Sequence, residues 1–351
     1  MYRALIADDS VLMRKMIRKA LEAKDFKIVA EASNGVDAVF KCENHNPDIV
    51  IMDVVMPKMD GLTALQEIMK KTPTRVVVMS SYSPEYANAA LSALENGALG
   101  FIRKPGDSEI TTSSFIREIQ EKSLSFMQIN MNKIVYKGQN ITNKAELLDN
   151  TKMKIRRFLT PSNSLVIIGS STGGPKVVQE IISKIEKPFP PVILIQHLPV
   201  GFTKHFAARL DKLTSLNVIE AENGSKLEIN TIYVAPAGKH LVLQDDERNN
   251  YEIYLYEGDR VNGVIPSIDP TVISASYYYG KNLCLCILTG MGNDGLAGAR
   301  YCKNNNAIII AQDEASSMIY GMPKAIVDAE LADYIDNPSK IAIILNNQYR
   351  K

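Results

Sequence analysis

Three acidic residues stand where they could share one site. Asp8 and Asp9 follow a short apolar run at residues 3–7, and Asp53 follows another run at 49–52. If both runs are parallel strands, their carboxyl ends meet at one edge of a sheet and the three carboxylates crowd together. Crowded carboxylates require a counter-ion, and Mg²⁺ is the hard divalent cation that such oxygen ligands suit. The pattern predicts a Mg²⁺ site formed by these three residues.

A hydroxyl and an ammonium group extend this first constellation. Ser80 ends the apolar run at 75–79, and Lys104 follows the run at 100–102. A phosphoryl group on Asp53 would meet the metal ion, the Ser80 hydroxyl and the Lys104 ammonium at once. Each aspartate taken alone could instead be a loop or helix cap. The required residue types at separate strand ends favour a phosphorylation site.

A candidate nucleophile stands in the second half of the chain. The apolar run at 165–168 leads into the letters GSSTG at 169–173, which match the G-x-S-x-G pattern. In that pattern glycines let the backbone bend, so that the central serine, here Ser171, projects from the strand end. A P-loop would need a lysine that is missing, and the glycine spacing of a dinucleotide-binding turn is also missing. A simple Ser/Thr helix cap remains the alternative.

A serine nucleophile needs a general base, and the chain has only four histidines. His197 directly follows the apolar run at 192–196, so it could meet Ser171 at one sheet edge. His240, after the letters APAGK, is the alternative base. We expect His205 on a helix surface and His45 in a turn of the first half.

The base in turn needs an acid that orients it. Asp294 lies in the glycine-rich letters TGMGNDG at 289–295, which follow the apolar run at 283–288. A helix N-cap is the structural alternative for Asp294, and Asp313 is a competing acid. The order Ser, His, Asp differs from the order Ser, acid, His of α/β-hydrolases, so a different fold is expected.

The elements that must position the first constellation alternate between strands and helices. Five apolar runs separated by helix-length segments predict an α/β domain with an open, doubly wound (βα)5 parallel sheet at residues 1–122. The expected strands are 3–7, 27–30, 49–52, 75–79 and 100–102, and the expected helices are 11–23, 35–44, 61–71, 84–95 and 111–127.

A linker at 123–160, with a short helix at 144–154, is expected to lead into a second α/β domain at 161–351. This domain should combine a parallel sheet with an antiparallel hairpin insertion at about 219–265, where Asn223-Gly224, Asn249-Asn250 and Asn262-Gly263 are turn candidates. The expected strands are 165–168, 192–196, 283–288 and 307–311, and the expected helices are 175–185, 201–213, 270–279 and 294–303.

Composition restricts the functions that this chain can have. It has 351 residues, and 40 basic against 39 acidic residues leave a net charge of +1, which gives no electrostatic case for binding nucleic acid. No apolar run approaches the ~20 residues of a membrane-spanning helix, so neither a signal peptide nor membrane insertion is expected. Cys284 and Cys286 could point to zinc, but they lack a partner pair, and reduced thiols in a cytoplasmic protein fit better.

The first half resembles the receiver domains of two-component response regulators over residues 1–122. The resemblance rests on the letters DDS (8–10), MDVVMPKMDGL (52–62), MSS (79–81) and KP (104–105). It implies that Asp53 is the phosphoacceptor, that Asp8 and Asp9 help to hold Mg²⁺, and that Ser80 and Lys104 are switch residues. Phe101 stands where receivers place an aromatic switch, although a plain core residue is the alternative.

The second half resembles the chemotaxis protein-glutamate methylesterases (CheB type) over residues 162–348. The letters are GSSTGGP (169–175), IQHLP (195–199), APAGKH (235–240) and TGMGNDG (289–295). The resemblance implies Ser171 as nucleophile, His197 as general base and Asp294 as the orienting acid, with Thr172 and the Met291 backbone shaping the site. The letters PSIDPTVISAS (266–276) depart from the family pattern, which bears on receptor preference.

The two resemblances together imply a response regulator that hydrolyses γ-glutamyl methyl esters on chemoreceptors, releases methanol, and deamidates receptor glutamines. Its partners would be the receptors and a histidine kinase, and it would act as a cytoplasmic monomer at receptor arrays, with no cofactor for the hydrolysis. We hypothesise that the unphosphorylated receiver covers the Ser171 site and that phosphorylation of Asp53 releases or reorients it.

Two other functions stay open at the level of sequence. The second half could be a binding module with a vestigial Ser171 site, which activity on a methylated receptor would test. It could also use a nucleotide at the glycine-rich turn, which would predict stabilisation by nucleotide.

Overall fold

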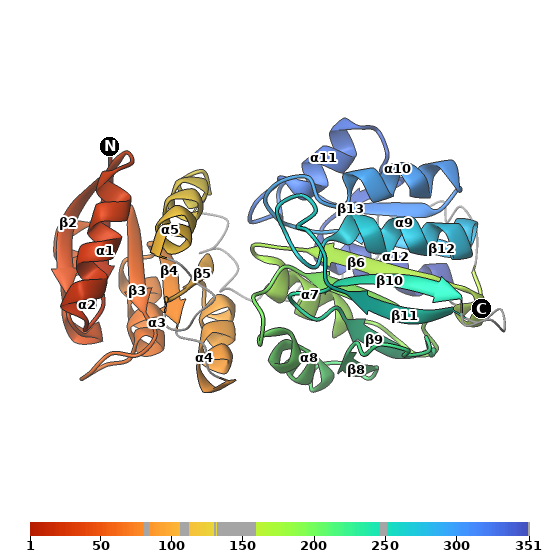
Figure 1. Ribbon diagram of the computed structural model, residues 1–351, viewed down its shortest axis with the longest axis horizontal. Helices are drawn as coiled ribbons and strands as arrows, with labels where there is room; N and C mark the ends of the chain where they lie inside the picture. Colours follow the sequence, from red (N-terminus) through yellow and green to blue (C-terminus); the bar gives the residue numbers. More distant parts are fainter. Residues whose placement is uncertain (81–83, 106–111, 130, 132–158, 246–250, 350–351) are drawn as a thin grey trace, which may run out of the picture. The chain divides into compact units, whose positions relative to one another are not determined.

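The computed structural model describes all residues except 81–83, 106–111, 130, 132–158, 246–250 and 350–351. The chain divides into two compact units, Met1–Tyr136 and Lys137–Lys351, each with its own sheet (Figure 1). Helix α5 (Thr112–Met127) runs past residue 122, where the first domain was predicted to end. The predicted helix at 144–154 lies outside the described residues. The domain limits 1–122, 123–160 and 161–351 stay predictions.

The first unit is built on a parallel sheet, as predicted. Its described strands form a five-stranded sheet in the order β2-β1-β3-β4-β5, and every neighbouring pair is parallel. The strands are β1 (Tyr2–Ala7), β2 (Phe26–Ala32), β3 (Ile49–Asp53), β4 (Arg75–Ser80) and β5 (Gly100–Arg103); the other helices are α1 (Val11–Glu22), α2 (Gly35–His45), α3 (Gly61–Lys71) and α4 (Pro84–Glu95).

Helices of the first unit begin at polar residues that cap them. Ser10, Asn34 and Asp60 accept hydrogen bonds from the N–H groups three residues further on, at 3.3, 3.0 and 2.8 Å. These bonds satisfy N–H groups that have no partner within the helix. Because other residues cap α1, α2 and α3, the side chains of Asp9 and Asp53 are left for the edge of the sheet.

The second unit is also built on a parallel sheet. Its described strands form a seven-stranded sheet in the order β14-β13-β12-β6-β7-β9-β8, with every neighbouring pair parallel. The chain enters at β6, adds strands on one side and then adds β12 and its successors on the other, so the strand order reverses beside β6. Ligand sites of open α/β sheets lie at the carboxyl ends of strands at such a reversal. The strands are β6 (Leu165–Ser170), β7 (Val192–Gln196), β8 (Asn217–Glu220), β9 (Thr231–Val234), β12 (Leu283–Ile287), β13 (Ile308–Gln312) and β14 (Tyr334–Asp336).

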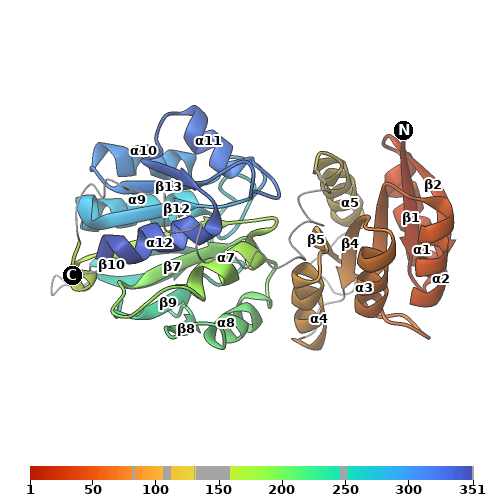
Figure 2. The same ribbon diagram turned by 180° about the vertical axis from the view of Figure 1, so that it is seen from behind.

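Helices cover both faces of this sheet, which explains why the residues of β6, β7 and β12 are buried throughout. Helices α7 and α12 lie on the face seen in Figure 2, and α9 and α10 lie on the face seen in Figure 1. The helices are α7 (Gly174–Ile182), α8 (Thr203–Asp211), α9 (Ile268–Tyr279), α10 (Leu296–Asn304), α11 (Met322–Asp328) and α12 (Pro338–Tyr349).

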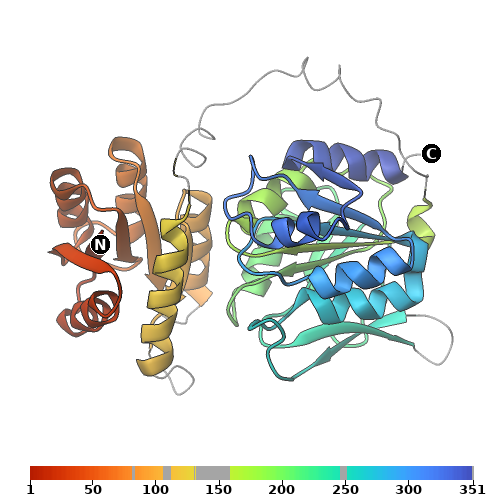
Figure 3. The same ribbon diagram turned by 90° about the horizontal axis from the view of Figure 1, so that it is seen from above.

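The predicted antiparallel insertion is present but shorter than expected. Strands β10 (His240–Asp245) and β11 (Tyr251–Tyr256) form an antiparallel ribbon that packs beside α9 (Figure 3). Strands β8 and β9, which the sequence placed around the hairpins, belong instead to the parallel sheet. The turn candidate Asn249-Asn250 lies outside the described residues.

Candidate functional site

The first site lies at the carboxyl ends of β1 and β3. Asp8, Asp9 and Asp53 each offer a carboxylate oxygen within 4.8 Å of the others. Asp8 and Asp53 are buried, whereas Asp9 is exposed. Asp8 Oδ1 also accepts a hydrogen bond from the Ser10 N–H at 2.9 Å, which fixes its rotamer. The structure thus brings the three predicted carboxylates together.

Lys104 is the cation of this site. Its Nζ lies 2.8 Å from Asp8 Oδ2 and 2.6 Å from Asp53 Oδ2. Burial raises the pKa of Asp53 above its ordinary value, although the Lys104 charge and hydrogen bond oppose that rise. Burial works against the charged form of Lys104 too, but the two aspartates leave its pKa raised. The ammonium group therefore stays charged beside the carboxylates.

The carboxylate cluster has the donor set of a magnesium site. The buried Asp8 Oδ2 is in contact with the Lys104 ammonium and has no further hydrogen-bond partner among the described residues. A carboxylate oxygen with spare acceptor capacity can accept a metal ion, and three carboxylates form the all-oxygen set that Mg²⁺ prefers. These residues fit the ion that the sequence predicted.

Ser80 and Phe101 lie on neighbouring strands of the same sheet, Ser80 at the end of β4 and Phe101 within β5. Ser80 is buried at the end of β4, and its carbonyl accepts the Lys104 N–H at 2.9 Å. Phe101 is buried on β5, with the Lys122 ammonium 5.5 Å from its ring centre and hydrogen-bonded to its carbonyl at 2.7 Å. Their roles as switch residues stay predictions.

The second site begins at Ser171, directly after β6. The Ser171 N–H donates to the Thr289 carbonyl at 3.0 Å, and the Ser171 carbonyl accepts the Gln196 side-chain amide at 2.9 Å. That amide is fixed in turn, because its oxygen accepts the Ser170 hydroxyl at 2.6 Å. The backbone of the turn is thus held on both sides, while the Ser171 hydroxyl makes no hydrogen bond to the described residues.

Glycine at position 290 permits this close packing. A Cβ on Gly290 would lie 2.7 Å from the Ser171 Cβ and closer still to Met322 Sδ. Real Cβ atoms do not approach other atoms so closely, so a larger residue would displace the serine turn. The two glycine-rich segments noted in the sequence therefore contact each other directly.

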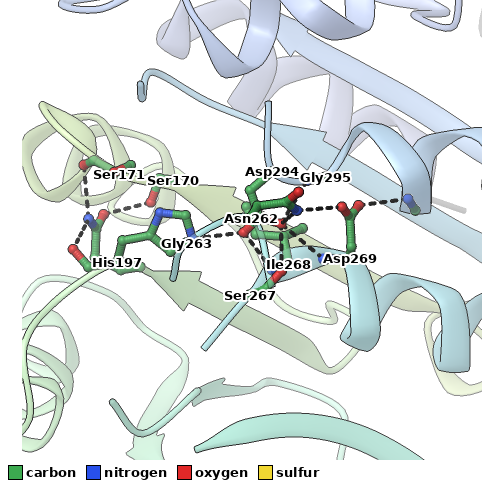
Figure 4. A network of polar contacts seen from close by, with 12 residues as sticks. Ser170, Ser171, His197, Asn262, Gly263, Ser267, Ile268, Asp269, Asp294 and Gly295 are labelled. Atoms are coloured by element: carbon green, nitrogen blue, oxygen red, sulfur yellow. Dashed lines mark hydrogen bonds and ion pairs between the residues drawn. The ribbon is translucent and has the colours of Figure 1, made fainter. Parts of the chain in front are cut away.

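His197 and Asp294 form a hydrogen-bonded pair. His197 Nε2 lies 2.9 Å from Asp294 Oδ2, and their side chains are only 11% and 3% exposed (Figure 4). The carboxylate can accept only, so it fixes the imidazole with its proton on Nε2. The other ring nitrogen, Nδ1, is then the basic one.

Asp294 is the most heavily hydrogen-bonded carboxylate of this site. Its Oδ1 accepts the Ser267 hydroxyl at 2.6 Å, and its Oδ2 accepts the Ile268 N–H at 2.8 Å (Figure 4). Burial alone would raise the pKa of Asp294, but the His197 contact and these further donors hold the pKa below its ordinary value. The residue therefore remains an anion beside the imidazole.

The structure distinguishes His197 and Asp294 from the alternatives that the sequence left open, His240 as base and Asp313 as acid. His240 is buried, with Nε2 2.9 Å from the Asp259 carbonyl and Nδ1 accepting the Ser267 N–H at 3.2 Å, so both ring nitrogens are occupied. Asp313 accepts the Ser316 N–H instead of a histidine. His205 lies within α8. The expectation of a turn at His45 was wrong, because His45 is the last residue of α2 and the helix is capped only at Asn46.

Thr172 and Met291 lie in the two glycine-rich segments. The Thr172 carbonyl accepts the Thr289 hydroxyl at 3.0 Å, which ties the segments together, and Met291 is 51% exposed. Their contribution to catalysis stays a prediction.

Sequence reasoning missed several polar residues of this site. Gln196 was seen only as the end of a strand, and Asn262 only as a turn residue. Asn262 donates to Asp294 Oδ1 at 2.8 Å and to Asp269 Oδ2 at 2.7 Å. The turn signal at Asn262-Gly263 was present in the sequence, but its contact across 32 positions was not.

Neither the cysteines nor the described helices indicate a zinc site or a membrane-spanning segment. Cys42, Cys284, Cys286 and Cys302 are buried free thiols, and burial raises the pKa of Cys284 to about 12. In the described part of the chain, only Asp8, Asp9 and Asp53 form a cluster with metal-like spacing. No helix among the described residues is long and apolar enough to cross a membrane.

Comparison with known proteins agrees with both halves of the sequence resemblance. Residues 166–345 match the CheB methylesterase family, and residues 4–114 match the response regulator receiver domain family. The chain is 37% identical over 336 residues to the protein-glutamate methylesterase/protein-glutamine glutaminase of Thermotoga maritima, covering 95% of this chain and 94% of that protein. Its identity to the Archaeoglobus fulgidus protein of the same name is 39% over 329 residues, covering 93% and 92%.

A solved structure matches the second unit. The crystal structure of the Thermotoga maritima CheB methylesterase catalytic domain has 38% sequence identity and a TM-score of 0.52, and the match covers 53% of this chain and 98% of that chain. These findings confirm the predicted family, and the chain therefore belongs to the CheB methylesterase family and carries a response regulator receiver domain in its N-terminal part.

Proposed function

We propose that this chain is a phosphorylation-controlled protein-glutamate methylesterase and protein-glutamine glutaminase of chemoreceptors. Relatives that match it over nearly their whole length carry that double name. The observation that carries the proposal is the 2.9 Å contact between His197 and Asp294, in the unit that presents Ser171 at a strand end. An oriented imidazole with one basic nitrogen is what a serine nucleophile requires.

In the proposed reaction, His197 Nδ1 takes the Ser171 proton while the serine oxygen attacks the ester carbonyl. The C–O bond to the methoxy group then breaks, the imidazolium returns the proton, and methanol leaves an acyl-enzyme. Water attacks the acyl-enzyme with the same imidazole as base, which frees the glutamate carboxylate and Ser171. A glutamine side chain would follow the same path and release ammonia.

Negative charge develops on the carbonyl oxygen during the attack. Helix α7 begins at Gly174, immediately after the nucleophile turn, so its N-terminus presents a partial positive charge near Ser171. We assign Thr172 and the Met291 backbone to shaping this region. Asp294 holds the imidazole in place and stabilises its protonated form.

The receiver unit would accept a phosphoryl group on Asp53. Asp8, Asp9 and Asp53 would hold Mg²⁺, which when bound neutralises charge on the phosphoryl oxygens. Lys104 would pair with the phosphorylated side chain, and Ser80 and Phe101 would move in response, relieving inhibition of the Ser171 site. The phosphodonor would be a histidine kinase, and the substrate a chemoreceptor on the cytoplasmic side of the membrane. Monomeric state and the absence of nucleic-acid binding stay predictions.

Methanol release from a methylated chemoreceptor tests both halves of this proposal. The wild type, Ser171→Ala and Asp53→Ala would be compared with and without acetyl phosphate. Ser171→Ala should lose about 10³-fold or more in rate, because it removes the nucleophile. Asp53→Ala should keep the basal rate but lose the stimulation by acetyl phosphate.

Each variant tests a different part of the proposal. Near-normal release by Ser171→Ala would exclude the nucleophile. Stimulation that persists in Asp53→Ala would exclude the proposed control but leave the esterase. No release by the wild type from several methylated receptors would favour a phosphorylation-switched binding module instead.

A further inference from the structure

Asn262 places one amide nitrogen between two buried carboxylates. Its Nδ2 lies 2.8 Å from Asp294 Oδ1 and 2.7 Å from Asp269 Oδ2, so each N–H bond serves a different carboxylate (Figure 4). Asp294 and Asp269 are 3% and 5% exposed. The shared amide is thus a neutral bridge between two side chains that would otherwise repel each other.

The backbone around Asn262 holds this bridge in position. Asn262 and Gly263 both have positive φ, 54° and 77°, as in a type I′ turn. The N–H groups of Val261 and Val264 donate to each other's carbonyls at 3.2 and 3.1 Å and close the turn. Asparagine suits this position for two reasons: it tolerates positive φ, and its short amide side chain reaches both carboxylates.

Asp269 has the contacts of an ionised carboxylate. Its Oδ1 accepts the Gly298 N–H at 2.7 Å, and its Oδ2 accepts the Asn262 amide. Burial raises the pKa of Asp269, and the Asp294 charge adds to the rise, while these donors oppose it. Asp269 thus places a second buried carboxylate beside the His197–Asp294 pair.

A second charge so close has a predictable effect on His197. Negative charge favours the imidazolium form, and an imidazole that is already protonated cannot accept the Ser171 proton. Titratable groups near this cluster include His240, whose Nδ1 accepts the Ser267 N–H, and Asp259 and Arg260, which precede the turn. The Arg260 guanidinium donates to the Gly263 carbonyl at 3.3 Å.

We propose that Asn262 is a positioning residue that shares its amide between Asp294 and Asp269 and so limits the negative charge that these two carboxylates direct at His197. The inference rests on the proposed hydrolase function and adds a specific control of its pH range. Asn262 acts through Asp294 and does not itself touch the reacting atoms.

The pH profile of kcat/KM for methanol release tests the proposal. Asn262→Gly keeps a residue that accepts positive φ but removes the amide, and Asp269→Asn removes the second charge. The acid limb should move to higher pH in Asn262→Gly by about half a pH unit or more, because the carboxylates lose a shared donor. It should move to lower pH in Asp269→Asn and return close to the wild-type position in the double variant.

An unmoved acid limb in Asn262→Gly, with only a lower rate, would reduce Asn262 to a structural residue and overturn the proposal. The proposal would also be overturned if the double variant showed only the summed rate losses of the two single variants, with no return of the acid limb. Asn46→Gly in the first unit is a matched control, since Asn46 is an exposed asparagine with a φ of 41°. Its pH profile should equal that of the wild type.

A direct titration removes the dependence on turnover. The His197 ring signals in the NMR spectrum of the full chain, assigned by comparison with a His197→Gln variant, should titrate at higher pH in Asn262→Gly than in the wild type. Equal titration points would overturn the inference even if the variant were inactive. Failure of the proposed function is distinguishable, because it would show as wild-type chain that releases no methanol or as release that survives Ser171→Ala.

Discussion

At the scale of single residues, Asp294 links the contact with His197 to the start of a helix. Its oxygens accept the N–H groups of Ile268 and Asp269, which are the first residues of α9. The carboxylate therefore caps α9 from a position about 25 residues later in the chain. The sequence offered a helix cap as the alternative to a catalytic role for Asp294, but α10 begins only at Leu296, after Gly295. The cap and the contact with His197 are made by the same side chain.

A prediction at this scale concerns Asp53 and pH. Burial raises the pKa of Asp53 in the folded state above its ordinary value in the unfolded chain. The folded state therefore loses stability as the pH rises from the unfolded-state pKa through the folded-state pKa. Asp53→Asn removes that effect. The free energy of unfolding of the first unit should exceed that of the wild type by about 1 kcal/mol at pH 7, and the difference should shrink towards pH 4.

Urea denaturation without Mg²⁺ at several pH values would measure this difference. Asp60→Asn is a matched control, because Asp60 is an exposed helix cap and asparagine caps a helix equally well. A difference for Asp53→Asn that stays constant between pH 4 and 7 would contradict the explanation by burial of charge. Adding Mg²⁺ should stabilise the wild type and not Asp53→Asn.

The contact between two glycine-rich segments matters at the scale of elements. The segment after β12 reaches the turn after β6 at Gly290, where a Cβ would collide with Ser171. Gly290→Ala should therefore displace the nucleophile and lower kcat/KM for methanol release by about 10- to 100-fold, since small misplacements of reacting groups are costly. The fold should survive, with a loss of stability of about 1–3 kcal/mol.

Parallel measurements of kcat/KM and thermal unfolding would separate these effects. Gly258→Ala is a suitable control, because the nearest atom to its Cβ is the edge of the Tyr256 ring at 3.2 Å, away from Ser171. Normal kcat/KM for Gly290→Ala would show that the serine turn does not need the close approach.

The strands were the elements that the sequence predicted best. Apolar runs such as those of β6 and β12 are buried at every position, and only a sheet covered on both faces accommodates them. The direction of β8 was predicted less well, because Asn223-Gly224 suggested a hairpin while β8 pairs in parallel with β9. A turn signal gives the place where a chain bends, but not the strand with which the next segment pairs.

The polar residues around the His197–Asp294 pair could not be predicted for a related reason. Asn262, Ser267 and Asp269 reach Asp294 across 32, 27 and 25 positions. Hydrogen bonds of this kind depend on how α9 packs against the sheet, and no local periodicity encodes that. Ser171, His197 and Asp294 could be found because each follows an apolar run that must end at the same edge.

At the scale of the whole molecule, each unit has its own sheet and its own core. Units of this kind unfold as separate cooperative blocks when little couples them. Calorimetry of the full chain should show two unfolding transitions. Mg²⁺ should raise the midpoint temperature of only one of them, the transition that Asp53→Asn also shifts. A single transition that responds to Mg²⁺ as a whole would instead show strong coupling between the units.

The order of strands in the second unit also has a consequence for synthesis. Strands β6, β7, β8 and β9 are made first and can pair with one another, but β12, the other neighbour of β6, is made later. On the ribosome, one edge of β6 must wait unpaired, and an open apolar edge is prone to aggregation. A nascent chain stopped before β12 would contain both Ser171 and His197 yet lack Asp294. We expect such a chain to associate with chaperones and to be inactive until the second side of the sheet is added.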